Sequence, residues 1–350
     1  MVIVGIDAHK RTHTAVAVDE HGRRLGAKTV PTTSAGHLEL VRWVARFGEH
    51  RFAVEDCRHL SRRLERDLLA AGETIVRVHP KLMAQLRRSA REFGKSDPID
   101  AVSVARVALR EEDLPTARLD GPERELRLLV DHREDLVNER TRSQNRLHWH
   151  LHELDPSLVL KPGSLDRYVV LDRLAALCEM HQGSTVATIA AELIELVRAK
   201  TRRINELERQ ITALVSDLAP SLLALEGCGA LTAAKLLGET AGVRRFADPG
   251  RFARFNGTAP IPVWSANKAR FRLNRGGNRQ VNAALHRIAV TQLRVGPGRD
   301  YVTRAMGRGK TKTEAIRSLR RRLSDEVYRR LTNDELARNV AGMTRVAEAA

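Results

Sequence analysis

Four acidic residues that lie far apart in the chain are the strongest candidates for chemistry. Asp7 directly follows the apolar run 2–6, and Glu55 ends another short apolar segment. Asp97 and Asp100 stand three positions apart at the predicted start of a helix, a spacing that places both carboxylates on one helical face. Carboxylates that converge repel one another unless divalent cations neutralise them, and oxygen ligands favour Mg²⁺ or Mn²⁺. Two such ions, about 4 Å apart, would activate the attacking oxygen and stabilise the leaving oxygen of a phosphodiester.

A purely structural interpretation competes for the last two acids. Asp97 as the N-cap, Pro98 as the first helical residue and Asp100 in the first turn would begin a helix well, because acids there interact favourably with the helix dipole. Asp7 and Glu55 have weaker structural explanations, since an acid that directly follows a buried strand is uncommon within a core. The four acids together therefore predict a metal site more strongly than any one of them does.

The elements that must bring these acids together can be predicted from hydrophobic periodicity in the first 110 residues. The predicted strands are 2–6, 12–19, 25–30, 51–55 and 74–78, and the predicted helices are 35–47, 60–71, 81–91 and 97–109. This order, in which three antiparallel strands precede alternating helices and strands, is typical of the ribonuclease H-like fold. If the first and fourth strands pair, Asp7 and Glu55 emerge at neighbouring strand ends.

The rest of the chain is predicted to be mainly helical, which makes the fold class α/β plus α. Two long helices are expected at 123–154 and 188–218, and the second has a coiled-coil seam. The seam residues are Ile204, Leu207, Ile211, Leu214 and Leu218. The seam could pair with the other helix of the same chain or with a second subunit. We expect the domains 1–115 (catalytic), 122–219 (coiled coil) and 220–335 (C-terminal), followed by a tail at 336–350.

The charge of the chain predicts a polyanionic partner, and DNA is the obvious one. The formal net charge is +17, and aromatic residues make up only 4% of the chain, which favours contacts to phosphates over stacking of bases. Gly227 and Gly229 form a turn before a predicted helix and could offer backbone N–H groups to a phosphate, as in helix-hairpin-helix modules. The basic candidates for nucleic-acid contacts are Lys268, Arg270, Arg272, Arg275, Arg279, Arg317 and Arg321.

Other features exclude several classes of protein. No segment approaches the ~18 apolar residues of a membrane span, and the N-terminal sequence lacks the pattern of a secretory signal. The three cysteines, Cys57, Cys178 and Cys228, have no zinc-ligand spacing. We therefore expect a cytoplasmic, nucleoid-associated protein without a membrane partner.

Several motifs together resemble the DEDD-type insertion-sequence transposases, which are bridge-RNA-guided recombinases. These are Gly5-Ile6-Asp7, Val54-Glu55, the segment 95–101 (KSDPIDA) and the segment 225–229 (LEGCG). The resemblance covers nearly the whole chain and implies a RuvC-like N-terminal domain, a coiled-coil middle and a C-terminal transposase domain. It also implies that Asp7, Glu55, Asp97 and Asp100 bind Mg²⁺.

The resemblance further implies a nucleophile. The segment from Phe255 to Ser265 is similar to the family segment that ends in a serine, so Ser265 matches the residue that attacks the scissile phosphate and forms a phosphoserine link to DNA. A guide RNA and a homo-oligomer, a dimer or a tetramer, whose partner subunit supplies the metal-binding acids are implied as well. The sequence departs from the family pattern at Ala266, where glycine is usual, and at 56–58, where small residues are usual.

Three functions remain open at this point. The first is a transposase that cleaves and rejoins DNA through Ser265. The second is a RuvC-like nuclease that resolves branched DNA with water as the nucleophile and needs only the four acids. The third is an inactive nucleic-acid-binding scaffold.

Overall fold

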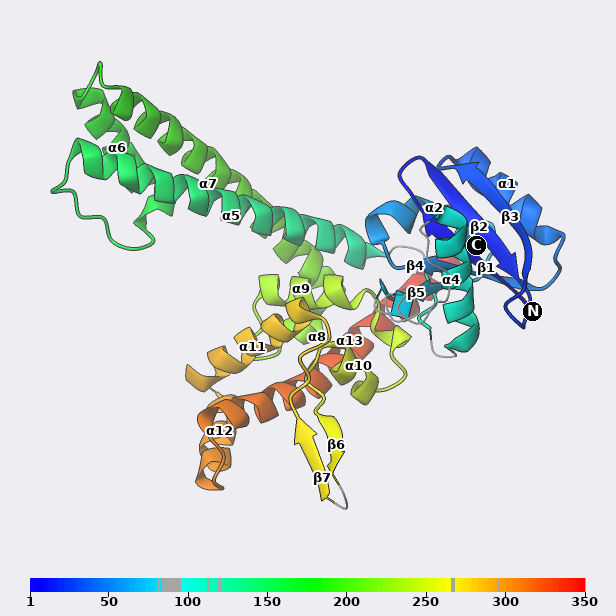
Figure 1. Cartoon of the computed structure of the whole chain (residues 1–350). Helices are drawn as coiled ribbons and strands as arrows, with labels where there is room; N and C mark the ends of the chain where they lie inside the picture. The colour runs from blue at the N-terminus through cyan, green and yellow to red at the C-terminus, as the bar shows by residue number, and fades with distance from the viewer. Residues whose placement is uncertain are drawn as a thin grey trace. The chain divides into compact units, whose positions relative to one another are not determined.

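The chain forms two compact units, Met1–Asp120 and Gly121–Ala350 (Figure 1). The computed structural model describes residues 1–80, 82–83, 96–111, 114–118, 121–265, 268–294 and 296–349. The side chains of residues 58–59, 265, 268–269 and 341–349 lie outside this description.

A five-stranded mixed sheet forms the centre of the first unit. Its strands are β1 (Val2–Ala8), β2 (Thr12–Val18), β3 (Arg24–Pro31), β4 (His50–Glu55) and β5 (Ile75–Val78). They lie in the order β3-β2-β1-β4-β5, in which the first three strands are antiparallel and β4 and β5 run parallel to β1. The helices of this unit are α1 (Ser34–Ala45), α2 (Arg58–Ala70) and α4 (Asp97–Arg110). This arrangement confirms the predicted ribonuclease H-like fold; the predicted helix 81–91 lies outside the described residues apart from 82–83.

Both faces of this sheet are buried, because alternate residues of β1 enter different cores. Val4 and Ile6 pack with Leu40 and Leu64, which come from α1 and α2. Ile3 packs on the other face with residues of α4 such as Val104. A strand that is buried on both faces has a continuous run of apolar residues in its sequence, which is why β1 could be predicted.

Gly5 lets the backbone of α4 pack directly against β1. A Cβ at this position would lie 2.1 Å from the carbonyl oxygen of Ala101 and 2.5 Å from the backbone nitrogen of Ala105. Side chains alternate along a strand, so Asp7 faces the same side of the sheet as Gly5, toward α4. The close approach therefore fixes the first turns of α4 next to the end of β1.

A pair of buried histidines lies on the side of the sheet that α1 and α2 cover. His13 of β2 stacks on His37 of α1 with 5.3 Å between ring centroids, and each side chain is only 1% exposed. His37 Nδ1 lies 2.7 Å from a carboxylate oxygen of Asp67. Burial, and to a smaller extent the nearby charges of His37 and His9, lower the pKa of His13 to about 4. His13 is therefore neutral in the folded protein at pH 7.

In an Asp7→Asn background, we expect the first unit to lose stability between pH 6.5 and pH 4. The substitution removes Asp7, whose raised pKa would stabilise the folded unit on acidification over the same pH range. The unfolded chain binds a proton at His13 near pH 6.5 and the folded chain only near pH 4, so acidification favours unfolding by up to about 3 kcal/mol over this window. Denaturant unfolding followed by Trp43 fluorescence, with Trp149→Phe and Trp264→Phe introduced, measures it. Adding His13→Gln should make the free energy of unfolding much less dependent on pH in this range. An equally steep pH dependence in that variant would contradict the assignment of the effect to His13.

Long helices dominate the second unit. α5 (Pro122–Leu154) and α7 (Thr185–Leu218) run side by side, and α6 (Tyr168–Met180) packs at their far end (Figure 1). Arg133 pairs with Glu208 at 2.7 Å, which joins α5 to α7. The predicted pairing of two long helices is thus confirmed within one chain, and Ile204, Leu207 and Ile211 of the seam are buried there.

Most of the remaining helices of this unit share one core with the near ends of α5 and α7. They are α8 (Pro220–Leu223), α9 (Ala230–Thr240), α10 (Pro249–Phe255), α11 (Arg279–Arg294), α12 (Pro297–Gly307), α13 (Lys312–Ala349) and the 3₁₀ helix Val243–Arg245. The strands β6 (Ile261–Ser265) and β7 (Lys268–Arg272) form a separate hairpin, and the 3₁₀ helix Ser164–Asp166 packs with α6 and α7. Leu126 of α5 and Ile211 of α7 belong to the same cluster as Leu236 and Leu285. The four-part domain division stays a prediction, although one core spans position 219 and α13 continues through 336–349.

A buried lysine ties α9 to α5 within this unit. Lys235 is 3% exposed, and its ammonium lies 3.0 Å from Asp131 and 2.8 Å from Glu134. A buried charge needs such partners, because its desolvation is otherwise very costly. The two carboxylates therefore fix α9 against one side of α5.

Candidate metal-binding active site

Two of the predicted acids follow paired residues of neighbouring parallel strands. Ile6 of β1 pairs with Val54 of β4. Asp7 and Glu55 come next in their strands, at the carboxyl edge of the sheet. Both are partly buried, and Asp7 is 13% exposed. The strand pairing expected from the sequence therefore exists, and it places both acids at one edge.

The other two acids occupy the first turn of α4. Ser96 is the N-cap and makes no side-chain capping hydrogen bond, so Asp97 is the first helical residue and Pro98 the second. The interpretation of Asp97 as the cap was wrong by one residue, and a capping role does not explain this carboxylate. Asp100 donates its backbone N–H to the carbonyl of Ser96, and the residue is 9% exposed.

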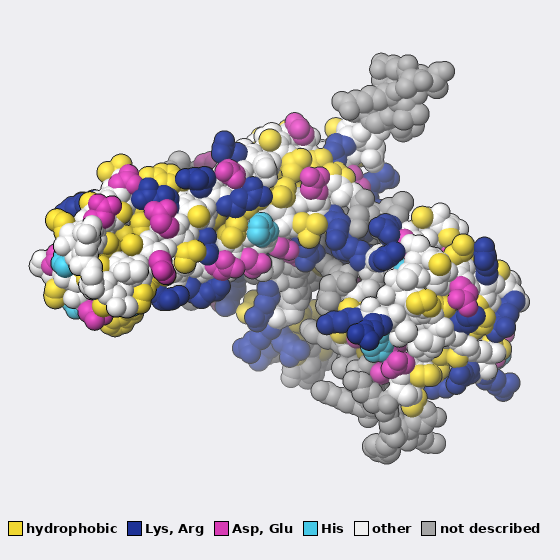
Figure 2. All heavy atoms as spheres, turned by 90° about the horizontal axis from the view of Figure 1, so that it is seen from above, with side chains coloured by type: hydrophobic (Ala, Val, Ile, Leu, Met, Phe, Trp, Pro, Cys, Tyr) yellow, Lys and Arg dark blue, Asp and Glu magenta, His cyan; other side chains and the backbone are white. Residues whose placement is uncertain are grey.

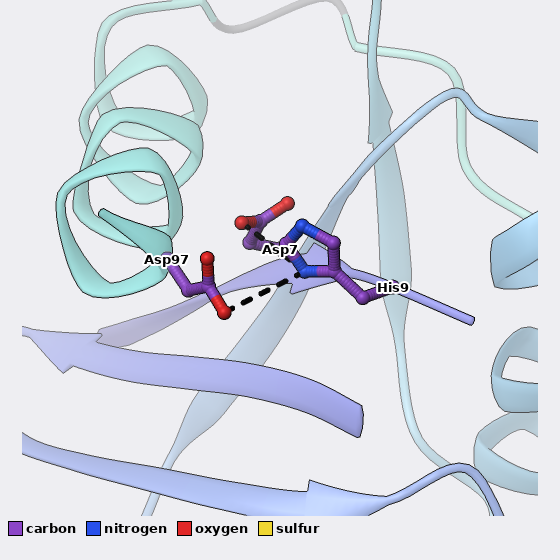
Figure 3. Close-up of side chains that lie close together, drawn as sticks. All are labelled: Asp7, His9 and Asp97. Atoms are coloured by element: carbon purple, nitrogen blue, oxygen red, sulfur yellow. Dashed lines mark ion pairs between the residues drawn. The ribbon is translucent and has the colours of Figure 1, made fainter. Parts of the chain in front are cut away.

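A histidine completes a cluster of possible metal ligands. His9 Nδ1 lies 3.6 Å from a carboxylate oxygen of Asp7 and 3.8 Å from one of Asp97 (Figure 3). One ligand atom from each of the three residues lies within 4.8 Å of the others, a spacing that could hold an ion. The sequence analysis did not include His9 among the candidate ligands. Because side chains alternate along a strand, a residue two positions after Asp7 is expected on the same side as Asp7, and this spacing could have indicated His9.

The charges of the other three predicted acids act on Asp7. Of these three, Asp97 lies with Asp7 and His9 in the cluster of ligand atoms found among the described residues, and Glu55 and Asp100 are not part of that cluster. Burial raises the pKa of Asp7 to about 6; the charge of His9 opposes the shift, and those of Asp100, Asp97 and Glu55 add to it. One carboxylate oxygen of Asp7, Oδ2, is buried and accepts no hydrogen bond from any described residue. A divalent cation at this position would offset the repulsion and satisfy that oxygen. The residues present therefore fit a metal site built from hard oxygen ligands.

Ser265 belongs to the second unit, whereas the acids belong to the first. It ends β6, and its backbone pairs with Lys268 across a two-stranded hairpin. The side chain of Ser265 lies outside the described residues, so the predicted nucleophile has a place in the fold but no described contacts.

The predicted nucleic-acid contacts lie in several places of the second unit. Gly227 has a positive φ of +81°, and Gly229 precedes α9; both line an open cavity of about 640 Å³ together with Thr232 and Arg287. Arg287 was not among the predicted contacts. Residues 270, 272, 275, 279 and 317, all arginines, are exposed. Arg321, by contrast, pairs with Asp325, which neutralises part of its charge.

Comparison with known proteins identifies the family. Residues 4–156 match the model of the DEDD transposases of IS110 type, described as a transposase, and residues 219–303 match a model described as the transposase IS116/IS110/IS902 family. The chain belongs to the IS110 family of transposases. An IS116 insertion element protein of Streptomyces clavuligerus is 29% identical over 98% of both chains. An IS900 insertion element protein of Mycobacterium paratuberculosis is 25% identical over 92% of this chain and 93% of that protein.

Solved structures of RuvC are similar to part of this transposase. Thermus thermophilus RuvC in complex with a Holliday junction substrate is 18% identical. The match covers 31% of this chain and 94% of the RuvC chain, with a TM-score of 0.25.

Within the part of the transposase that the structure describes, no helix is both long and apolar enough to cross a membrane.

Proposed function

We propose that this IS110-family transposase cleaves and rejoins DNA by metal-assisted phosphoryl transfer at Asp7, Glu55, Asp97 and Asp100. The observation that carries the proposal is the cluster of Asp7, His9 and Asp97 around a buried oxygen of Asp7 that accepts no hydrogen bond, with the charges of Glu55 and Asp100 acting on the same carboxylate. Among the described residues, His9 at 3.6 Å is the one possible cationic partner of this oxygen. This excess of acidic groups also argues against an inactive scaffold.

The metal implied by this donor set is Mg²⁺ or Mn²⁺. When bound, such an ion polarises the scissile phosphate and stabilises developing negative charge on the leaving oxygen. The acids hold and neutralise the ion, and burial at Asp7 reduces competition from water. His9 adds one nitrogen donor, and imidazole is more common around transition metals than around Mg²⁺. We therefore expect Mn²⁺ to support the reaction at least as well as Mg²⁺.

The nucleophile in this proposal is Ser265. Its hydroxyl oxygen forms a bond to the scissile phosphorus and loses its proton, while the bond from phosphorus to the deoxyribose oxygen breaks and that oxygen leaves as a hydroxyl. Attack by the hydroxyl of another DNA end then reverses the exchange and restores the serine. The rejoining step conserves the bond energy of the phosphodiester, so no external energy source is needed.

The proposal also includes the partners of the protein, which are DNA, a guide RNA and further subunits of the same chain. The cationic surface of the second unit supports binding of nucleic acid, and the family resemblance adds a guide RNA and a homo-oligomer whose subunits share active sites. The resemblance also supports the three functional parts 1–115, 122–219 and 220–335. The protein would then work in the cytoplasm, on the nucleoid.

Trapping a covalent adduct tests this function. The protein, with its co-purifying RNA and Mg²⁺, is incubated with labelled DNA of its own element ends and analysed under denaturing conditions. We expect a protein–DNA band that EDTA and Ser265→Ala abolish and that Ser216→Ala, a change at an exposed serine of α7, leaves intact.

The competing functions give different results in the same experiment. Cleavage that persists in Ser265→Ala without any adduct would assign a RuvC-like nuclease that uses water. A wild-type protein that neither cleaves nor links DNA with any divalent metal would overturn the enzymatic function altogether.

A further inference from the structure

The β6–β7 hairpin extends away from the helices of its unit (Figure 1). Among the described elements, each of its strands packs extensively only against the other strand. Its register pairs Pro262 with Phe271 and Val263 with Arg270. Because side chains alternate along each strand, the hairpin has two faces of different character.

One face of the hairpin is aromatic and uncovered. Trp264 is 73% exposed and Phe271 is 69% exposed. Trp264 pairs with Ala269 and Phe271 with Pro262, so the two aromatic residues occupy diagonal positions on the same face, where Cα atoms of such a ladder are about 7–8 Å apart. Trp and Phe are normally the most buried of large side chains when nothing binds them. Two of them on one uncovered face indicate a binding surface.

The opposite face of the hairpin is cationic. Arg272 pairs with Ile261 and Arg270 with Val263, and both guanidinium side chains are exposed. The surrounding sequence has the same sign of charge, since no acidic residue lies between Asp248 and Asp300, a stretch with ten lysines and arginines. The α5–α7 pair, in contrast, carries acidic and basic side chains together on the face seen in Figure 2. The concentration of positive charge is thus a local property of this part of the unit.

This charge distribution decides which partner fits the aromatic face. A second copy of the hairpin would bring the same positive charge and be repelled. A nucleic acid supplies what both faces lack: phosphates for the arginines and flat, apolar bases for the rings. Bases in a duplex are already stacked on one another, so exposed rings can stack only on bases that are unpaired. A low overall content of aromatic residues does not prevent this, because two rings at one site are sufficient.

We propose that Trp264 and Phe271 stack on unpaired bases of the DNA substrate while Arg270 and Arg272 contact the adjacent phosphates. The proposal rests on the proposed function, because strand exchange separates base pairs at the exchange point. Trp264 directly precedes Ser265 in the chain. A base held on this ring would bring the adjoining DNA strand to the end of β6, where Ser265 lies. Trp264 and Phe271 are therefore positioning residues for strand transfer.

Fluorescence of Trp264 tests the stacking directly. A full-length variant with Trp43→Phe and Trp149→Phe retains only this tryptophan, since the chain has three. Titration with a single-stranded oligonucleotide in EDTA should quench its fluorescence, whereas a duplex of the same sequence with no unpaired bases should not. Equal quenching by both DNAs, or none, would overturn the proposal.

Substitutions supply the second measurement. Trp264→Ala or Phe271→Ala should weaken binding of the single strand by about 5- to 100-fold and leave duplex binding unchanged, and Trp264→Phe should restore most of the loss. Trp149→Ala is the matched control, because Trp149 on α5 is equally exposed at 76%. Unchanged single-strand binding in Trp264→Ala would contradict the proposal. A change in sedimentation without a change in DNA binding would assign the face to a protein contact instead.

These readouts are independent of catalysis. Binding in EDTA needs neither the metal nor Ser265, so an inactive enzyme could still show stacking. Conversely, adduct formation with unaltered efficiency in Trp264→Ala would leave the proposed function intact and remove the positioning role.

Discussion

Replacing Asp7 with asparagine should abolish strand exchange and, at the same time, stabilise the metal-free protein. The isosteric amide cannot neutralise a divalent cation, so the phosphoryl transfer loses its metal. DNA binding should persist with its normal salt dependence, since it rests on lysine and arginine contacts to phosphates. Recombination in Asp7→Asn at the wild-type rate would disprove the carboxylate site.

The stabilisation follows from the direction of the pKa shift. The pKa of Asp7 is about 6 in the folded protein and near 3.8 in the unfolded chain, so the folded state holds its proton more tightly. This contribution to stability is complete below pH 3.8 and is lost as the pH rises through 6. At pH 7.5 the substitution should therefore raise the free energy of unfolding by up to about 3 kcal/mol in EDTA.

Metal addition should remove most of the difference in stability between the two proteins. Mg²⁺ at 100 times its Kd adds about 2.7 kcal/mol to the wild type and should add little to Asp7→Asn. Denaturant unfolding reported by Trp43, with and without Mg²⁺, measures both effects. Glu20→Gln, at an exposed acid in the turn after β2, is the control and should change neither. A destabilised Asp7→Asn in EDTA would mean that the carboxylate has a structural partner.

Replacing Gly5 with alanine should destabilise the first unit by about 3 kcal/mol, at the upper end of the usual cost of overpacking. The added Cβ meets backbone atoms of Ala101 and Ala105 at 2.1 and 2.5 Å, and backbone cannot rotate away as a side chain can. α4 must move off β1, and Asp97 and Asp100 move with it. Because a misplacement of 1 Å can cost about 100-fold in rate, strand exchange should fall at least that far.

Unfolding experiments and strand-exchange assays test this prediction on the same samples. Gly307→Ala is the matched control, because a Cβ at that glycine meets nothing within 4 Å. Wild-type stability in Gly5→Ala would show that α4 does not rest on β1 at this position. Lost stability with unchanged strand exchange would show that the acids tolerate a displaced helix.

Much of the first unit could be predicted because its elements are encoded locally. The continuous apolar run of β1 and the alternation in β2 gave the correct strands, and Asp7 and Glu55 could be placed at strand ends from their positions alone. The pairing of β1 with β4 depends on long-range contacts and could only be assumed. The cap of α4 was misplaced by one residue, since Ser96 and Asp97 have equally good capping side chains.

Features that depend on tertiary contacts could not be predicted. His9 joins the acid cluster only because α4 brings Asp97 to the end of β1. The β6–β7 hairpin was missed since its strands are only five residues long, β6 contains a proline, and both strands lie outside the core. Likewise, nothing in the residues around Ser265 marked it as a nucleophile; only the family resemblance did.

The paired helices α5 and α7 have a mechanical consequence. At 33 residues, α5 is about 50 Å long, which matches roughly 15 base pairs of duplex DNA, or more than one helical turn. A rod of this length acts as a lever: a tilt of about 10° at its base displaces the α6 end by roughly 9 Å. Lys235 of α9 forms ion pairs with Asp131 and Glu134 near the beginning of α5, and these pairs join the two helices there. Force applied to the distant tip is therefore transmitted to α9, the helix that follows Gly229.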